Sequence, residues 1–212
     1  MAKLAGRRGI GWSLLPAVLA SAGCLKWETT TGSDDGTPPP PPTSILRWAG
    51  TARFSETHIL AGNRDYKTTF EGPVTWQKEE NPNRPPADAI VYRISSGQMH
   101  VAYGGTRFLP SDTCRDAGAA DVDLAANDPR DETKSYLYLW PDGKYAGAVL
   151  KTATVTITRT CDSGFVGSFS EALRMSLDID GTLTAGRQIQ GEMAPDGVSG
   201  ITATGSWDFA PM

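Results

Sequence analysis

KTATVTITRTC, residues 151–161, decides the fold class, because its side chains alternate between polar and apolar from Thr152 to Thr158. Threonine occupies every even position from 152 to 160, whereas Ala153, Val155 and Ile157 stand at odd positions between them. A period of two residues places successive side chains on opposite faces of a β-strand. One face of this strand is therefore predicted to be buried and the other to be wet, which is typical of an antiparallel sheet.

The same period recurs along the chain from residue 45 to residue 212. Apolar side chains share one face in further runs that contain Trp48, Ala52 and Phe54, then Phe70, Val74 and Trp76, then Met99, Val101 and Tyr103, and finally Ile201, Trp207 and Phe209. Five glycines also fall on apolar faces, where they permit sharp coiling of a sheet: Gly50, Gly72, Gly147, Gly181 and Gly205. We therefore predict an all-β fold over residues 45–212. It is a single antiparallel domain of about eight to ten strands, either a small barrel, lipocalin-like in shape, or a sandwich.

The charge of the chain excludes one class of partner. The net charge is −4 over 212 residues, and the first 23 residues hold three basic side chains and no acidic one. Without them the remainder is more acidic still. An acidic protein is a poor partner for phosphate backbones or anionic membrane surfaces, so no nucleic acid is expected to bind.

The N-terminal residues have the pattern of an export signal. Lys3, Arg7 and Arg8 precede an apolar stretch, residues 10–22, that is too short to span a bilayer. Residues 1–23 are therefore predicted to be a signal peptide. Two cleavage patterns compete: Ala20-Ser21-Ala22 suits ordinary signal peptidase, whereas small residues stand directly before Cys24 in Ser21-Ala22-Gly23-Cys24.

The second pattern resembles the lipobox of bacterial lipoproteins. The resemblance implies that Cys24 carries lipid and attaches the chain to a membrane. Residues 24–44, rich in proline, would then be a tether, because a run of prolines favours an extended conformation. Leu25 after the cysteine implies the outer membrane of a bacterial cell envelope. The alternative cleavage predicts a secreted or periplasmic protein.

The odd number of cysteines supports lipidation of Cys24. The chain has three cysteines. If Cys24 takes lipid, Cys114 and Cys161 remain as a pair, and export places them in an oxidising compartment. A disulfide between them is therefore predicted.

LDIDGTLTAG, residues 177–186, resembles the first motif of the haloacid-dehalogenase phosphatases. The resemblance implies a nucleophile at Asp178 and an acid/base at Asp180. Two features of the context argue against it. The stretch alternates as the other strands do, whereas strands of a parallel sheet are apolar on both faces. The 32 residues after Asp180 contain no lysine and are too few for the rest of such a site. Both aspartates are interpreted as solvent-facing, and no catalytic residue is predicted.

Residues 109–135 are predicted to be an acidic loop, or to contain a short helix over residues 116–127. Asp121, Asp123 and Asp128 are weak calcium candidates, because their spacing fits no EF-hand. His58 is placed in a loop and His100 on a solvent-facing position. Neither has a second histidine or a cysteine at metal-ligand spacing. No metal site and no cofactor are predicted.

Aromatic residues offer a further hint of a ligand. Trp48, Trp76, Tyr92 and Trp140 line a cavity on one interpretation and fill the core on the other. The sequence therefore predicts a non-catalytic exported lipoprotein whose β-domain binds a small apolar ligand, a glycan or an envelope protein. The alternative is a secreted hydrolase whose site has no recognisable motif.

Overall fold

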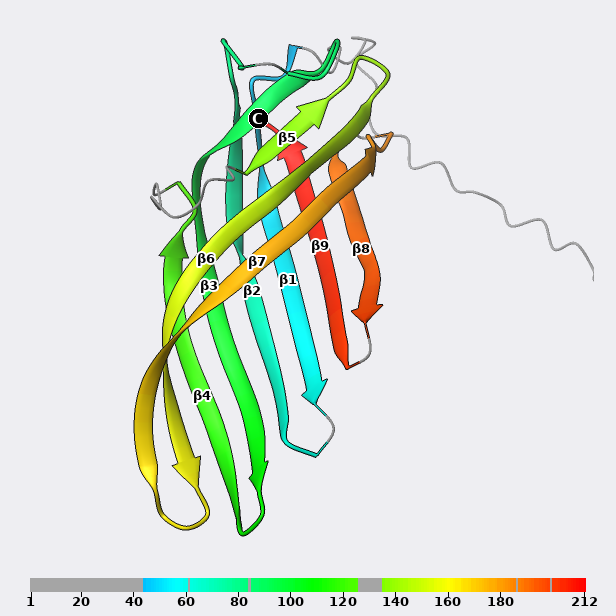
Figure 1. Cartoon of the computed structure of the whole chain (residues 1–212). Coiled ribbons are helices and arrows are strands. Elements are labelled where there is room, and N and C mark those ends of the chain that lie inside the picture. The colour runs from blue at the N-terminus through cyan, green and yellow to red at the C-terminus, as the bar shows by residue number, and fades with distance from the viewer. Residues whose placement is uncertain (1–43, 61, 84, 126–134, 186, 199) are drawn as a thin grey trace, which may run out of the picture. The chain divides into compact units, whose positions relative to one another are not determined.

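The computed structural model describes residues 44–60, 62–83, 85–125, 135–185, 187–198 and 200–212. The predicted signal peptide and the tether up to residue 43 lie outside the described residues. Nine strands make up the fold (Figure 1): β1 (Arg47–Leu60), β2 (Arg64–Lys78), β3 (Ile90–Leu109), β4 (Asp112–Asp123), β5 (Tyr136–Leu139), β6 (Lys144–Cys161), β7 (Val166–Thr182), β8 (Ile189–Val198) and β9 (Ile201–Pro211).

All nine strands belong to one sheet, and every pairing in it is antiparallel. From one edge the order is β7, β6, then β3, β2, β1, β9 and β8. The strands β4 and β5 both lie between β6 and β3, at opposite ends of these two long strands. The prediction of an all-β, antiparallel fold of about eight to ten strands is confirmed.

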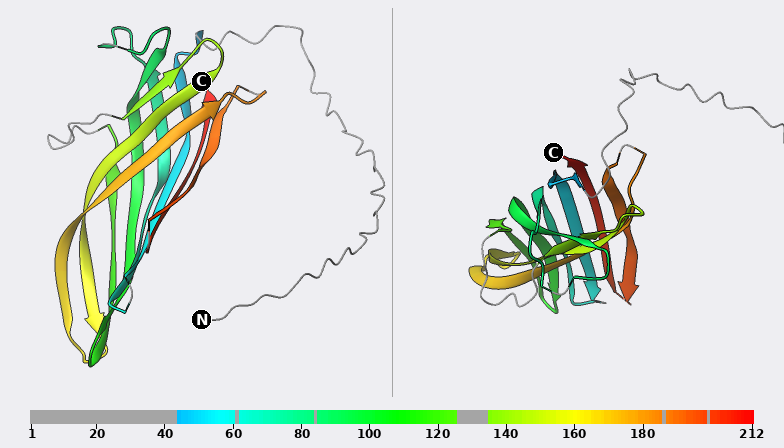
Figure 2. Two further views of the ribbon diagram at one scale, coloured as in Figure 1. Left: turned by 45° about the vertical axis from the view of Figure 1, so that its right-hand side comes forward. Right: turned by 90° about the horizontal axis from the view of Figure 1, so that it is seen from above.

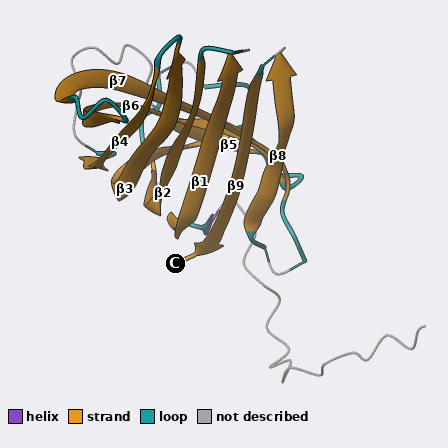
Figure 3. Ribbon diagram, turned by 90° about the horizontal axis from the view of Figure 1, so that it is seen from below, coloured by secondary structure: helices purple, strands orange, loops and turns teal. Residues whose placement is uncertain are grey.

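The sheet curls into a partial ring that does not close into a true barrel. The hairpin of β6 and β7 crosses over the face formed by β1, β2, β3 and β9 (Figures 2 and 3). No hydrogen-bond ladder joins the edge strands β7 and β8 among the described residues. Side chains bridge this side of the ring instead: the Tyr145 hydroxyl of β6 donates to the Gln190 carbonyl of β8 at 2.8 Å.

The alternating pattern that predicted the fold also fills its core. In β6, Ala153, Val155 and Ile157 are buried, while the threonines at 154, 156 and 158 are exposed. The interior at one end of the ring is packed with large side chains that are almost fully buried: Trp48, Trp76, Tyr92, Phe70, Phe209, Met99, Leu137, Leu139, Leu177 and Ile179. Burial of this apolar surface is the main force that holds the curled sheet together.

Two of the five glycines on the apolar faces of strands, Gly50 and Gly72, are needed where neighbouring strands approach closely. A Cβ atom on Gly50 would overlap the backbone carbonyl of Asp208 in β9, and one on Gly72 would overlap that of Gln98 in β3. Glycine is therefore the residue that lets β1 and β2 lie so tightly against their neighbours.

The structure corrects the prediction for residues 109–135. Neither a loop nor a helix occupies their first half, because Asp112–Asp123 forms the strand β4. The strand is paired to β3 along its whole length and to β6 over residues 114–118. His58 is likewise not in a loop: it lies in β1, opposite Tyr66 of β2. In both places, hydrogen-bonded pairing with neighbouring strands of the sheet outweighs the weak local preference of these residues for a loop or a helix.

The predicted disulfide between Cys114 and Cys161 is confirmed. The two cysteines are direct cross-strand partners on β4 and β6. The bond therefore joins neighbouring strands that are 47 residues apart in sequence.

Candidate functional site

The apolar lining of the curled sheet gives way to charged side chains toward the end where the disulfide lies. The strand registers order the inner face into rows: Phe54, Phe70, Val101 and Ala120 in the first, Glu56, Thr68, Tyr103 and Gly118 in the second, and His58, Tyr66, Gly105, Asp116 and Arg159 in the third. Six side chains around the last two rows form what we call the inner cluster: Arg64, Tyr66, Tyr103, Asp116, Arg159 and Glu171.

A two-pronged ion pair forms one half of the inner cluster. Arg159 of β6 donates from Nε and Nη2 to the two carboxylate oxygens of Asp116 on β4, each at 2.7 Å. The Asp116 side chain is only 1% exposed and that of Arg159 is 21% exposed. The hydrogen bonds that Arg159 donates to Asp116 raise the pKa of Arg159. The guanidinium also lies 4.9 Å from the centre of the Phe169 ring, which fixes its plane.

Arg64 of β2 is the centre of the other half. Its Nη2 donates to the Tyr103 hydroxyl and lies 3.5 Å from a carboxylate oxygen of Glu171 on β7. Burial acts to lower the pKa of Arg64, but the hydrogen bond to Tyr103 and the nearby acidic groups outweigh it, so that the pKa is raised. Among the described residues, no partner accepts a hydrogen bond from its buried Nε. A buried N–H without a partner costs free energy, and a ligand oxygen would remove that cost.

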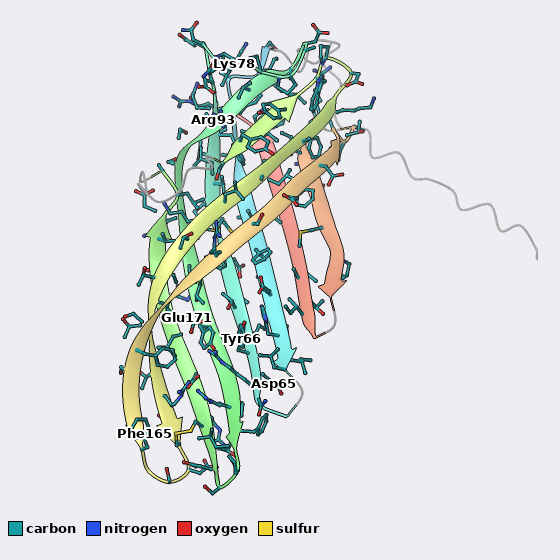
Figure 4. All side chains as sticks on the ribbon, viewed as in Figure 1. Asp65, Tyr66, Lys78, Arg93, Phe165 and Glu171 are labelled. Atoms are coloured by element: carbon teal, nitrogen blue, oxygen red, sulfur yellow. A yellow bond between two sulfur atoms is a disulfide. The ribbon has the colours of Figure 1, made fainter. Side chains whose placement is uncertain are left out.

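Aromatic rings support both guanidinium groups. Tyr66 stacks on Tyr103 with ring centres 5.6 Å apart and on His58 at 4.3 Å. Arg64 lies over the Tyr66 ring at 4.7 Å. Figure 4 labels Tyr66 on β2 and Glu171 on β7, and the hydrogen bond from Arg64 to Glu171 joins these two strands. Burial raises the pKa of Tyr66 and of Tyr103 above the ordinary value of a tyrosine.

This arrangement suits binding of a polar molecule. Within the part of the chain that the structure describes, the Nε of Arg64 has no acceptor, while Glu171 is 37% exposed and offers acceptor oxygens. Both oxygens of Asp116 already accept a hydrogen bond from Arg159. The cluster can thus both donate to and accept from a ligand whose polar groups are spaced to match.

Hollows of the described surface also lie away from the inner cluster. One of about 410 Å³ is lined by Arg53, Glu71 and Glu192 between β1, β2, β8 and β9. Its charged side chains are exposed, and Arg53 is already paired with Glu71 at 2.5 Å. Exposed pairs of this kind contribute little energy and demand no further partner. We therefore place the candidate site at the inner cluster.

The four aromatic residues that the sequence suggested as ligand-binding lie in two different parts of the fold. Trp48, Trp76 and Tyr92 meet inside the filled end of the ring, where none is exposed, and Tyr92 donates to the Ile45 carbonyl at 2.8 Å. Trp140 lies apart from them, half-buried beside Tyr138 with ring centres 6.2 Å apart.

Several acidic candidates lie on the outer surface. Asp178 and Asp180 are exposed on β7, opposite Ala148 and Ala146, as their alternation predicts. His100, also exposed as predicted, pairs with Asp121 at 2.9 Å across β3 and β4. The Asp123 carboxylate accepts from the Ala125 N–H at 2.8 Å. Asp128 lies outside the described residues.

One group of potential metal ligands gathers near the disulfide. The ligand atoms of Asp112, Cys114 and Cys161 lie within 4.8 Å of one another. Both sulfurs are in the disulfide, and a metal needs the free thiolate. This group is therefore not a metal site.

Sequence reasoning missed the residues of the inner cluster, although a signal for them exists. Arg159 follows Ala153, Val155 and Ile157 at the same odd parity, and Glu171 shares the parity of the buried Leu173 and Met175. A charged residue at an inward position of a half-buried strand indicates a partner or a site. Which charges meet depends on strand order, which local patterns do not give.

No family model, no curated protein and no solved structure matches this chain. Within the part of the chain that the structure describes, no helix has the length and apolarity to cross a membrane.

Proposed function

We propose that this chain is a non-catalytic binding protein of the bacterial cell envelope that holds a small polar ligand against the inner cluster. One observation carries the proposal: charged and aromatic side chains gather, partly exposed, on the inner face of a sheet that is otherwise lined by apolar residues. Ligand sites are commonly concave and combine apolar walls with a few placed polar groups.

The ligand class follows from the chemistry of the cluster. Arg64 and Arg159 favour an acidic oxygen, Glu171 favours a hydroxyl or amino group, and the tyrosine rings favour a flat or sugar-like face. The apolar end of the ring is filled by Trp48, Trp76 and their neighbours, which are not exposed. We therefore favour a polar ligand, such as a sugar acid, over an apolar one.

The proposed location rests on the cysteines. With Cys114 and Cys161 joined, Cys24 is the remaining member of the three. A disulfide is typical of an oxidising compartment. Both facts support attachment of the chain to an envelope membrane through lipid on Cys24, with the outer membrane as its proposed destination.

Calorimetric titration tests the proposal. The probes are glucuronate, N-acetylglucosamine and phosphocholine, which present different combinations of acidic oxygens, hydroxyls and cationic groups. The parent chain should bind one of them, and Arg64→Met should abolish the heat of binding. Arg53→Met, which removes an exposed arginine of the outer face, is the matched control and should bind as the parent does. Binding that persists in Arg64→Met would contradict the proposed site, and conversion of the probe would support the hydrolase alternative.

A further inference from the structure

Exposed apolar side chains are concentrated at one end of the described domain. Three hairpin tips carry six of them, each 41–65% exposed: Ile59 and Leu60 between β1 and β2, Phe108 and Leu109 between β3 and β4, and Phe165 and Val166 between β6 and β7. Figure 1 shows these three turns at the lower end of the domain, and Figure 4 places Phe165 in the lowest part of the β6–β7 hairpin. We call these six residues the apolar tips. Gathered exposed apolar residues mark a surface for interaction.

Hydrogen bonds and the disulfide tie the three tips to one another. The Phe108 N–H donates to the Asn63 carbonyl at 2.9 Å, which links the β3–β4 tip to the β1–β2 tip. The Asp162 N–H donates to the Thr113 carbonyl at 2.9 Å, and Arg115 pairs with Asp162 at 2.9 Å. Together with the disulfide behind them, these bonds fix the β6–β7 tip beside the β3–β4 tip. The tips are thus held outward and cannot fold back into the core.

Charged residues of both signs stand just behind the apolar tips. Arg107 and Arg115 lie within a few residues of the turns, and so do Asp65, Asp112 and Asp162. Arg115 and Asp162 pair with each other at 2.9 Å, so positive and negative charges are interspersed here. Successive strand residues are about 3.3 Å apart, so these charges sit at the depth of lipid headgroups if the tips reach the acyl boundary.

We propose that the apolar tips insert into the interfacial layer of a zwitterionic phospholipid bilayer. Three features favour lipid as the occupant over a folded protein. The apolar pairs stand on separate turns, and these turns also carry polar residues such as Asn63 and Ser163. A protein interface has a contiguous packed centre, whereas fluid lipid fills the space around each tip. Charges of both signs behind the tips suit the paired positive and negative groups of a zwitterionic headgroup better than a purely anionic surface. The proposal does not rest on the ligand site or on lipid at Cys24.

Flotation with phosphatidylcholine vesicles measures the insertion. The test uses the full chain with Cys24→Ser, so that no attached lipid contributes. Serine at both Phe165 and Val166 should lower the partition coefficient about tenfold, and serine at both Phe108 and Leu109 should do the same. Leu46→Ser with Met212→Ser is the matched control, because these exposed apolar residues lie outside the tips. That control should bind as the Cys24→Ser chain does, with little dependence on salt.

A second measurement locates the contact directly. Methyl signals of Leu60, Leu109 and Val166 are recorded by NMR with spin-labelled phosphatidylcholine in the bilayer. They should broaden several-fold more than the methyl signals of Leu46. Equal broadening at the tips and at Leu46, an equal loss of binding in the tip variants and the control, or binding to anionic vesicles alone would each overturn the proposal.

Discussion

Asp116 and Arg159 form the most deeply buried ion pair of the inner cluster, with the Asp116 side chain 1% exposed. Arg159→Met would leave this carboxylate buried without its partner. The free energy of unfolding should fall by about 3–5 kcal/mol, because an unpaired buried charge is far less stable than a paired one. Urea unfolding measures the change. Adding Asp116→Leu to Arg159→Met should recover part of the loss. A double variant that loses the sum of the two single effects would show that the pair is not coupled.

Buried tyrosines give the domain a defined response to alkaline pH. Burial raises the pKa values of Tyr66, Tyr92 and Tyr103 above the ordinary value of 10.0. Their neutral forms are thus favoured in the folded state, so their contribution is complete below pH about 10. It is lost as pH rises through the raised values. Thermal unfolding should show a falling midpoint above pH about 10. The fall should be shallower in Tyr103→Phe, and an unchanged slope in that variant would refute the assignment.

The strand β4 shows where local sequence reasoning ends. Its residues 116–120, Asp-Ala-Gly-Ala-Ala, include no β-branched or aromatic side chain, so nothing local favours a strand. The strand forms because β3 and β6 pair with it on both sides, and because Cys114 and Asp116 bond to Cys161 and Arg159. By contrast, β6 and β7 were predictable, because their alternating side chains separate a buried face from an exposed one.

The disulfide should be a main support of the pairing between β4 and β6. It joins two cysteines that are 47 residues apart in sequence and so closes a long loop of the chain. In the chain-entropy description, replacing both Cys114 and Cys161 by alanine should lower the free energy of unfolding by about 4 kcal/mol. Urea unfolding of the variant beside the parent measures this. A loss well below 1 kcal/mol would mean that the remaining contacts hold β4 in place by themselves.

At the scale of the molecule, the sequence predicted the kind of sheet but not its closure. Alternation along each strand requires one buried face, and curling the sheet is one way to supply it. The incomplete ring depends on which edge strands meet. Contacts such as that of Tyr145 with Gln190, 45 residues apart in sequence, determine this. The inner cluster could not be predicted from the sequence for the same reason, because its members come from β2, β3, β4, β6 and β7.

Attachment to the membrane is a separate prediction about the whole chain. If Cys24 carries lipid, the parent chain should fractionate with membranes, and Cys24→Ser should release it into a soluble fraction. Mass spectrometry of the N-terminal peptide of the parent chain should show a modified Cys24. A soluble parent chain that begins at Gly23 would disprove the lipid anchor and would favour the secreted or periplasmic form.

Native mass spectrometry of the chain purified from the cells that produce it tests most directly whether the inner cluster is a ligand site. We predict that the parent chain and Arg53→Met carry a small polar molecule through gentle purification and release it on denaturation. Arg64→Met should carry none, because it lacks the guanidinium whose Nε has no acceptor among the described residues. A parent chain without any bound molecule, or the same bound mass in Arg64→Met, would contradict the account.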